Sequence, residues 1–461
     1  MAGSGLVAVP DERSAAAGLA PLLAVCCGYF MVILDVTIVN VAAPAIGREL
    51  VTSLTDLQWI VDGYTVAFAG LLLLGGALGD RWGHRRVFCL GVTVFTLSSL
   101  GCAVAGNAIT LTVFRLVEGC GAALLVPGSL ALLQQVYRTP SARARAFGLW
   151  GAIAGVAATA GPLVGGVLTS TVGWRWVFAI NLPVGVLCLV LTMVTVGPSP
   201  RDLGRVIDPL GQAAVVVAVA AFIAALNEAG RQGIGGPAVI GGVLVTALAA
   251  GVLVLRERFG SNPPLPLPMV RSRPVTGGTA IGFLFNFGFY GMIFAASVYF
   301  QQHQNLSAAL AGLALLPAMA VTMVASALSG RLSDRFPHRR LMLIGLLTAC
   351  FGLALWAIVG EAASYAVLAV AMVACGFGTS FTLTGATSTV MGAAPAGYTG
   401  TASAALNTAR QTGSAAGVAI SGSLIALAGL PVGVATFMAV GSAGYLLGAI
   451  LTVLCVPANP R

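Results

Sequence analysis

The apolar runs of this chain constrain its fold more than any other feature. Segments such as 213–226 and 238–255 contain no charged side chain, and they approach or reach the ~20 residues that cross a bilayer as a helix. Backbone groups in lipid must satisfy their own hydrogen bonds, which leaves helices or a closed barrel. The runs are long and do not alternate with period two, so they predict membrane-spanning helices. Only 8% of the residues are charged, against about 25% in a soluble protein, so most of the surface must face something other than water.

Fourteen apolar segments follow one another along the chain. An even number of spans places both chain ends on the same side of the membrane. The sequence therefore predicts an all-α polytopic membrane protein with fourteen transmembrane helices. The segments run at 18–46, 57–79, 86–106, 108–135, 142–170, 175–197, 208–228, 236–256, 275–302, 308–331, 340–359, 363–390, 400–428 and 433–456.

The arginines indicate which side that is. With the N-terminus placed in the cytoplasm, eighteen arginines fall inside and only Arg48, Arg175 and Arg231 fall outside. Cytoplasmic loops carry an excess of Lys and Arg, so both termini are expected to be cytoplasmic. The polar N-terminal stretch lacks a compact apolar region with a cleavage site, and it predicts no removable signal peptide. The net charge of +9 then reflects topology and does not indicate a nucleic-acid partner.

One charged stretch occurs twice. GALGDRWGHRR at 76–86 and GRLSDRFPHRR at 330–340 agree at seven of eleven positions and lie 254 residues apart. Two six-helix halves alone would place the copies roughly 180–200 residues apart, so the larger offset leaves room for two extra helices between parallel halves. The predicted organisation is a cytoplasmic tail at 1–17, a six-helix bundle at 18–197, a linker with two extra transmembrane helices at 198–274, and a six-helix bundle with a short tail at 275–461.

Several catalytic classes lack their residues in this sequence. The chain has no lysine, which a Walker A phosphate loop requires. Its nine cysteines form no C-x-x-C pair and its three histidines do not cluster, so no metal site is expected. No nucleophile–base pair can be identified either. We therefore expect neither an enzyme nor a bound cofactor.

Five stretches resemble the major facilitator superfamily. The charged stretch at 76–86 resembles the loop after the second helix in that superfamily. LDVTIVNVAAPAI at 34–46 and GVAATAGPLVGG at 155–166 resemble first- and fifth-helix motifs of its fourteen-helix drug:proton antiporters, and the tracts at 174–185 and 406–420 are also typical of that family. The resemblance implies the major facilitator fold, with two six-helix bundles and two extra central helices. The arginine-only, Ala-Gly-Val-rich composition favours a high-GC bacterium.

Asp35 is the leading candidate for proton coupling. It lies about fifteen residues into the first span among aliphatic neighbours, where a carboxylate costs about 3 kcal/mol and usually serves a function. Burial disfavours its charged form, so a group there can exchange a proton for a cationic substrate. An acid at this position is typical of the family. The alternative is a structural acid bonded to a neighbouring helix.

Three further charged residues lie within the early spans. Asp62 is expected either to line the outer vestibule and attract cations, or to be a solvated helix end. Arg115 and Glu118 share one face of the fourth span and can pair. The family pattern is R-x-x-Q-G-x-G, so Arg115 matches it and Glu118 replaces a glutamine. Glu118 is then either a second proton site or a counter-ion that neutralises Arg115.

Other polar and aromatic residues are candidates for the substrate pocket, which is expected at the midplane between the halves. For the polar residues near position 410, contact between helices is the alternative. For the aromatic residues, the alternative is packing against lipid. The polar candidates, some of which would tune Asp35, are Asn40, Arg115, Asn407, Arg410 and Gln411, and the aromatic candidates are Phe285, Phe287, Phe289 and Tyr290.

The repeated charged stretch is predicted to act as a conformational latch. Asp80 is expected to cap the N-terminus of the span at 400–428 in one conformation and to lose that contact in the other. The alternative is that these stretches only set topology. Pro337 replaces the motif glycine in the second copy, which weakens the case for its acid. The latch candidates are Gly76, Asp80, Arg81, Gly83, Arg85 and Asp334.

The fifth span carries the antiporter motif. Its Gly-Pro pair predicts a kink, and its glycines predict a flat face for close helix contact. Within the family, this segment is thought to seal the two halves against proton leak and to mark exporters. The motif residues are Gly155, Gly161, Pro162, Gly165 and Gly166.

Together these features predict a proton-coupled antiporter that exports amphipathic drugs or antibiotics across a bacterial cytoplasmic membrane. The expected partners are a small amphipathic molecule, protons and the lipid bilayer, with no nucleic acid. The protein is expected to be a monomer powered by the proton gradient. An exporter of one endogenous metabolite, a proton-linked importer, and a membrane sensor without transport are the alternatives. The Gly-Pro motif counts against import.

Overall fold

The computed structural model describes residues 19–137, 139–202, 208–259, 267–333, 335–360, 364–395 and 399–458, and every regular element within those ranges is a helix. The elements in chain order are α1 (Leu19–Glu49), α2 (Leu54–Trp82), α3 (His84–Ala103), α4 (Ala108–Val136), α5 (Pro140–Thr171), α6 (Trp176–Ala179), α7 (Asn181–Thr195), α8 (Pro209–Gln232), α9 (Pro237–Phe259), α10 (Leu267–Arg271), α11 (Arg273–Val298), the π-helical turn η2 (Tyr299–His303), α12 (Ala308–Ser333), α13 (His338–Val359), α14 (Tyr365–Ala393), α15 (Thr399–Ala428) and α16 (Leu430–Cys455).

These helices confirm the predicted all-helical membrane fold. Among the described residues, thirteen helical segments are long and apolar enough to cross a membrane. The helix α5 occupies the remaining predicted span, at 142–170. The predicted span at 175–197 is divided into α6 and α7 at Ile180, and the short α10 lies outside any predicted span.

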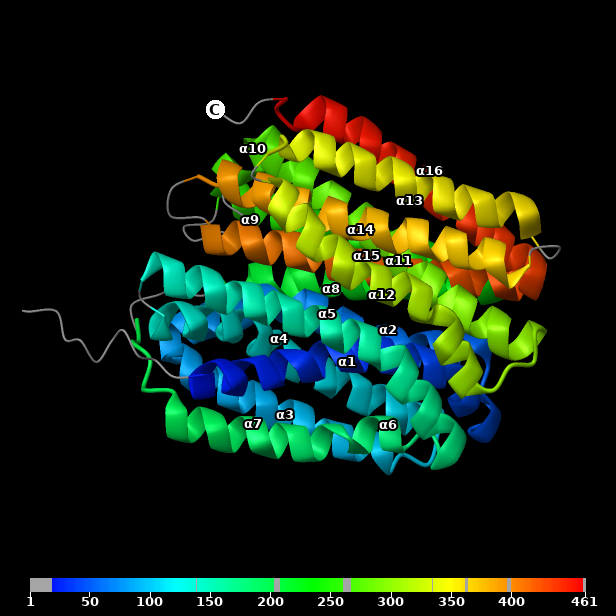
Figure 1. The fold of residues 1–461 in the computed structure, drawn as a ribbon, viewed down its shortest axis with the longest axis horizontal. Coiled ribbons are helices and arrows are strands. Elements are labelled where there is room, and N and C mark those ends of the chain that lie inside the picture. The colour runs from blue at the N-terminus through cyan, green and yellow to red at the C-terminus, as the bar shows by residue number, and fades with distance from the viewer. Residues whose placement is uncertain are drawn as a thin grey trace, which may run out of the picture.

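The helices form two groups that meet along two seams. The helices α1 to α7 pack chiefly on one another, as do α11 to α16, and the two groups lie one above the other in Figure 1. One seam joins α2 to α15, and the other joins α5 to α12. The predicted domain boundaries near residues 17, 197 and 274 stay predictions.

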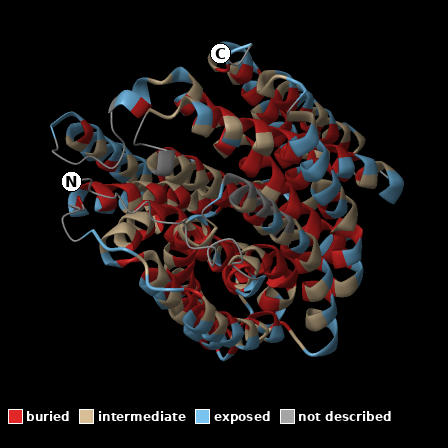
Figure 2. Cartoon of the chain, turned by 60° about the vertical axis from the view of Figure 1, so that its left-hand side comes forward, coloured by how far each residue is buried: buried red, intermediate tan, exposed pale blue. Residues whose placement is uncertain are grey.

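The two extra helices lie on one of these seams. The helix α8 packs against both α2 and α15, so it contacts each group, and α9 packs on α8. Few residues of α9 are buried, and Val243, Leu244 and Leu248 are more than half exposed. Exposed apolar side chains of this kind suit contact with lipid. Figure 2 shows the same arrangement for the whole chain, with buried residues inside and exposed residues at the periphery.

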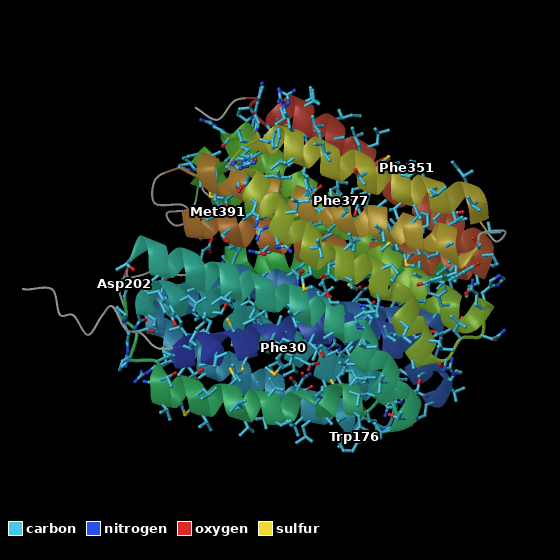
Figure 3. All side chains as sticks on the ribbon, in the orientation of Figure 1. Phe30, Trp176, Asp202, Phe351, Phe377 and Met391 are labelled. Carbon is cyan, nitrogen blue, oxygen red and sulfur yellow. The ribbon has the colours of Figure 1, made fainter. Side chains whose placement is uncertain are left out.

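The bundle has two distinct ends. We call the end with the α2–α3 connection the hairpin end, and the opposite end the far end. Asp202 from one group and Met391 from the other mark the hairpin end in Figure 3, whereas Trp176 lies toward the far end. Trp176 and Phe351 point outward and are 55% and 59% exposed, as lipid-facing aromatic side chains would be.

The two groups are joined firmly at the far end. Ser297 Oγ donates to the Asn40 carbonyl at 3.0 Å, and Gln301 Nε2 donates to the Val41 carbonyl at 2.9 Å. At the seam between α2 and α15, Gln58 Nε2 donates to the carbonyl of Ala419 at 2.6 Å. These buried bonds close the far end in this conformation.

Candidate functional site

A buried ion triad forms the centre of the candidate site. Arg115 Nη1 donates to Asp35 Oδ2 at 2.5 Å and to Glu118 Oε2 at 2.7 Å. All three side chains are at most 1% exposed. The structure therefore brings together three of the predicted residues, and it shows that Arg115 pairs with both acids at once.

Three helices position the triad. Asp35 comes from α1, and Arg115 and Glu118 come from adjacent turns of α4. The helix α2 supplies the carbonyl of Ile60, which accepts a hydrogen bond from Arg115 Nε at 3.1 Å. The Tyr64 ring of α2 lies 4.5 Å from the guanidinium carbon, close enough for a cation–π contact. These contacts hold the guanidinium in one place between the carboxylates.

The triad has one carboxylate more than its cation can neutralise. Asp35 Oδ1 and Glu118 Oε1 are buried, and neither has a hydrogen-bond partner among the described residues. An uncompensated buried charge is costly, whereas one proton on either carboxyl makes the cluster neutral. The arrangement is therefore suited to bind and release a single proton that the two acids share.

Asp62 belongs to a separate buried contact. Its carboxyl is fully buried, and Asn227 Nδ2 of α8 donates to Asp62 Oδ2 at 3.2 Å. The alternative of a solvated helix end is therefore wrong. Asn227 lies near the predicted end of its span, yet it is also fully buried, because α8 continues to Gln232. The second oxygen of Asp62 has no partner in the described part of the chain.

Arg410 of α15 lies near the seam with α2, where Thr408 donates to the Ala69 carbonyl at 3.2 Å. Its Nη1 donates to Asn407 Oδ1 at 3.0 Å, and its guanidinium carbon lies 5.8 Å from the Phe285 ring. Gln411 is partly exposed beside it. Asn40 lies elsewhere, buried in α1, where its side chain donates to the Val36 carbonyl at 2.6 Å.

Aromatic side chains of both groups lie in the interior of the bundle. Phe285, Phe287 and Phe289 are at most 6% exposed, and Tyr290 packs against the buried cores of both groups, so the lipid-facing alternative is wrong for these four residues. The sequence reasoning missed Tyr29 and Trp150, whose rings stack at 3.8 Å. It also missed Tyr64. The sequence shows only that each is an aromatic residue within a span, and this does not predict which residues its ring contacts.

The first charged stretch, at 76–86, is hydrogen-bonded to α7. Arg85 Nη2 donates to the Met193 carbonyl at 2.6 Å, and Asp80 Oδ1 pairs with His84 Nε2 at 3.0 Å. Gly83 has φ of +94°, a conformation that favours glycine. Gly76 and Arg81 lie in the last turns of α2.

The second copy of the hairpin has a different backbone. Pro337 has φ of −55° at the position that corresponds to Gly83. Asp334 lies outside the described residues. The proposed contact of Asp80 with the start of α15 stays a prediction.

The fifth-helix motif lies where α5 contacts α1 and α12. A Cβ at Gly161 would lie 1.9 Å from Thr37 Oγ1, and one at Gly165 would lie 2.7 Å from Ile38 Cγ1. On the other side, a Cβ at Gly166 would lie 2.6 Å from the Ala308 carbonyl oxygen. Close helix contact is therefore confirmed for these glycines. The contact at Gly155 is less close, because a Cβ there would lie 3.7 Å from its nearest neighbour, Met323 Cγ.

Pro162 does not interrupt its helix, because α5 runs continuously from Pro140 to Thr171. Its carbonyl oxygen would lie 2.2 Å from a Cβ at Gly312 of α12. The glycine at 312 thus lets the backbones of the two groups approach closely at this point.

Comparisons with known proteins identify the family of the chain. The Major Facilitator Superfamily model matches residues 25–418. The chain is 36% identical over 452 residues to the methylenomycin A resistance protein of Bacillus subtilis (strain 168), covering 97% of both proteins. It is 35% identical over 408 residues to the multidrug resistance protein Stp of Mycobacterium tuberculosis (strain CDC 1551 / Oshkosh), covering 88% of this chain and 76% of that protein.

A solved structure supports the fold. The structure of the POT family transporter PepTSo has a TM-score of 0.69 to this chain at 14% sequence identity, covering 97% of this chain and 98% of that one. At this identity the likeness concerns the fold alone.

Proposed function

Because the chain belongs to the major facilitator superfamily, we propose that it is a proton-coupled antiporter that exports amphipathic drugs or antibiotics by alternating access. Its bacterial relatives are named for resistance to antibiotics and drugs, which supports a drug exporter in the cell membrane. Proton coupling is the part of the proposal that rests on this chain's own residues.

The buried triad is the observation that carries the proposal. Two carboxylates share one guanidinium, and each keeps one buried oxygen to which no described residue donates. Loading one proton neutralises the triad, and releasing it restores a buried negative charge. A cluster whose charge changes by one in this way favours different helix arrangements in its two protonation states, which is the requirement for coupling.

The arginine distribution orients the cycle. We assign the hairpin end and both termini to the cytoplasm, because most arginines lie there. The far end then faces the outside, and the hydrogen bonds that join the two groups there close the outer side in this conformation. Inward protons supply about 2.3 kcal/mol per 100 mV of membrane potential, besides any pH gradient. The transporter acts as a monomer without a bound cofactor.

The other predicted residues take supporting roles in this proposal. Asp62 is a second proton site, separate from the triad. Asp80 is the latch that holds the hairpin end closed in the opposite conformation. The tight glycine contacts of α5 with α1 and α12 limit proton leak between the groups.

Gradient dissipation in everted membrane vesicles tests the function. A proton gradient is established by respiration and followed with a pH-sensitive dye, while compounds from an antibiotic panel are added. An exported compound should dissipate the gradient in vesicles that contain the protein, and not in vesicles from the same host without it. A panel that leaves the gradient intact, while the compounds still accumulate, would exclude proton coupling. A response confined to one metabolite would favour the metabolite exporter.

A further inference from the structure

Arg410 differs from every other charged side chain at membrane depth in the described residues. Asp35, Asp62, Arg115 and Glu118 are at most 1% exposed, whereas Arg410 is partly exposed. It lies eleven residues into α15, about 17 Å from the start of the helix. This depth is near the middle of the bilayer. Thr408, two residues earlier, donates its hydroxyl to the Ala69 carbonyl of α2 at 3.2 Å, so this part of α15 lies at the seam between the two groups.

The guanidinium has donors to spare. Only one of its nitrogens has a side-chain acceptor, Asn407 Oδ1. Arg410 Nε is buried without a partner, and no carboxylate pairs with Arg410 among the residues that the structure describes. An arginine offers five N–H donors in a planar fork that matches a carboxylate. Contact with Asn407 alone leaves most of this capacity unused, so a polar contact between helices does not account for the residue.

An aromatic side chain lies beside the cation. Phe285 of α11 faces the guanidinium at 5.8 Å. Tyr290, farther along α11, packs against the buried cores of both groups. Tyr29 stacks on Trp150 of α5. A cation that has no carboxylate partner among the described residues and lies beside an aromatic ring suits a ligand with a flat apolar body and one negative group.

We propose that Arg410 binds the anionic group of the exported substrate, and that the substrate class is an aromatic or otherwise apolar monocarboxylic acid. This inference deepens the proposed function and rests on it. It replaces the cationic substrate expected from Asp35 alone, because both acids of the triad are buried and bonded to Arg115. When one monoanion leaves and one proton enters, a net charge of +2 moves inward in each cycle. The membrane potential therefore contributes twice the free energy that it contributes for a single charge.

Equilibrium binding to the purified protein tests this assignment without any gradient. The probes are 2-naphthoate and its neutral isostere 2-naphthamide, each measured by equilibrium dialysis. Wild-type protein should bind the acid at least about tenfold more tightly than the amide. Arg410→Gln should weaken binding of the acid about tenfold or more and change binding of the amide less than about twofold. Arg410→Lys should keep an intermediate preference.

Arg273→Gln is the matched control, since it removes the same charge from an exposed position at the start of α11. It should bind both probes as wild type does. Gel filtration and thermal unfolding establish that each variant is folded. Equal affinity for acid and amide in the wild type, no saturable binding of the acid, or equal losses for both probes in Arg410→Gln would overturn the inference.

The same preparations separate this inference from the proposed function. If naphthoate binding depends on Arg410 but a pH gradient does not drive its transport in proteoliposomes, the acid site stands and proton coupling fails. If a gradient drives transport of neutral or cationic compounds only, proton coupling stands and the acid site fails.

Discussion

At the scale of single residues, Arg115 determines the state of the candidate proton site. It is fully buried and bonds to both carboxylates and to the Ile60 carbonyl. Removing one partner from a buried ion cluster leaves uncompensated charge and typically costs about 3–5 kcal/mol. This cluster is more sensitive to loss of the arginine than a single Arg–carboxylate pair, because two carboxyls would then lose their cation.

Arg115→Gln should therefore lower the unfolding free energy by about 3–5 kcal/mol, because two carboxyls then lie buried without a cation. Adding Glu118→Gln to that variant should recover part of the loss, since it removes one of the two acids. Thermal unfolding in detergent measures both effects. A double variant less stable than Arg115→Gln alone would contradict a charge-based role for the triad.

The sequence predicted the members of the triad but not how they meet. The spacing of Arg115 and Glu118 predicted their pairing, because both lie on one helix face. The contact with Asp35 depends on how α1 packs against α4, which a single sequence does not specify. The burial of Asn227 could not be predicted for a related reason. Its span was predicted to end at 228, whereas α8 continues to Gln232 and packs against α2 and α15.

At the scale of helices, glycine contacts determine how closely α5 approaches its neighbours. Thr37 Oγ1, which a Cβ at Gly161 would strike, donates to the carbonyls of Ile33 and Leu34. It cannot turn away without losing those bonds. Overpacking of this kind typically costs about 1–3 kcal/mol.

Gly161→Ala should accordingly lower the unfolding free energy by about 1–3 kcal/mol. Gly251→Ala in α9 is the control, because nothing lies within 4 Å of a Cβ there. Alanine favours a helix over glycine, so the control should be neutral or slightly stabilised. Thermal unfolding of the two variants provides the comparison, and equal melting temperatures would contradict the close α1–α5 contact.

The start of α8 and the end of α9 are joined by an ion pair with a pH signature. Arg256 donates to both oxygens of Asp208, at 2.9 and 3.0 Å. These bonds hold the pKa of Asp208 below its usual range. A lowered pKa in the folded protein means that the contribution to stability is complete above the unfolded value, about 3.9, and is lost as the pH falls through the folded value.

Asp208→Asn should therefore destabilise the protein near neutral pH and matter progressively less below about pH 4. Thermal unfolding of wild type and variant across that range, in a detergent that tolerates acid, measures the difference. A constant difference between the two at all pH values would contradict the ion pair as its cause.

Helix positions were easier to predict than helix contacts. All fourteen predicted spans lie within a few residues of observed helices, because the length of an apolar run follows from the bilayer. The repeat predicted two similar hairpins, but Gly83 and Pro337 give them different backbones. The seams between the groups depend on packing of small residues, which are frequent throughout this chain.

At the scale of the whole molecule, alternating access requires the far end to open. The bonds from Ser297 and Gln301 to the α1 carbonyls, and the bond from Gln58 to Ala419, must then break. The extra helix α8 contacts α2 and α15 across one seam, so it must follow one group or shift against both.

Reporter fusions test the orientation of the molecule. Fusions after Arg145 and after Arg273 should both report the cytoplasm, because both positions lie at the hairpin end. A fusion between 230 and 236 should report the outside, since α8 and α9 turn there. Opposite sides for the first two fusions would exclude the fourteen-span topology.

The most direct test of the account is the effect of Asp35→Asn on uphill export. The variant keeps the size of the side chain but cannot release a proton at that position. Substrate accumulation is measured in everted vesicles at a fixed pH gradient, with membrane protein levels matched by immunoblot. The account predicts that accumulation against the gradient is abolished while substrate still binds, and that Asp35→Glu retains part of the coupling. Accumulation by Asp35→Asn at the wild-type rate would contradict the assignment of the triad as the coupling site.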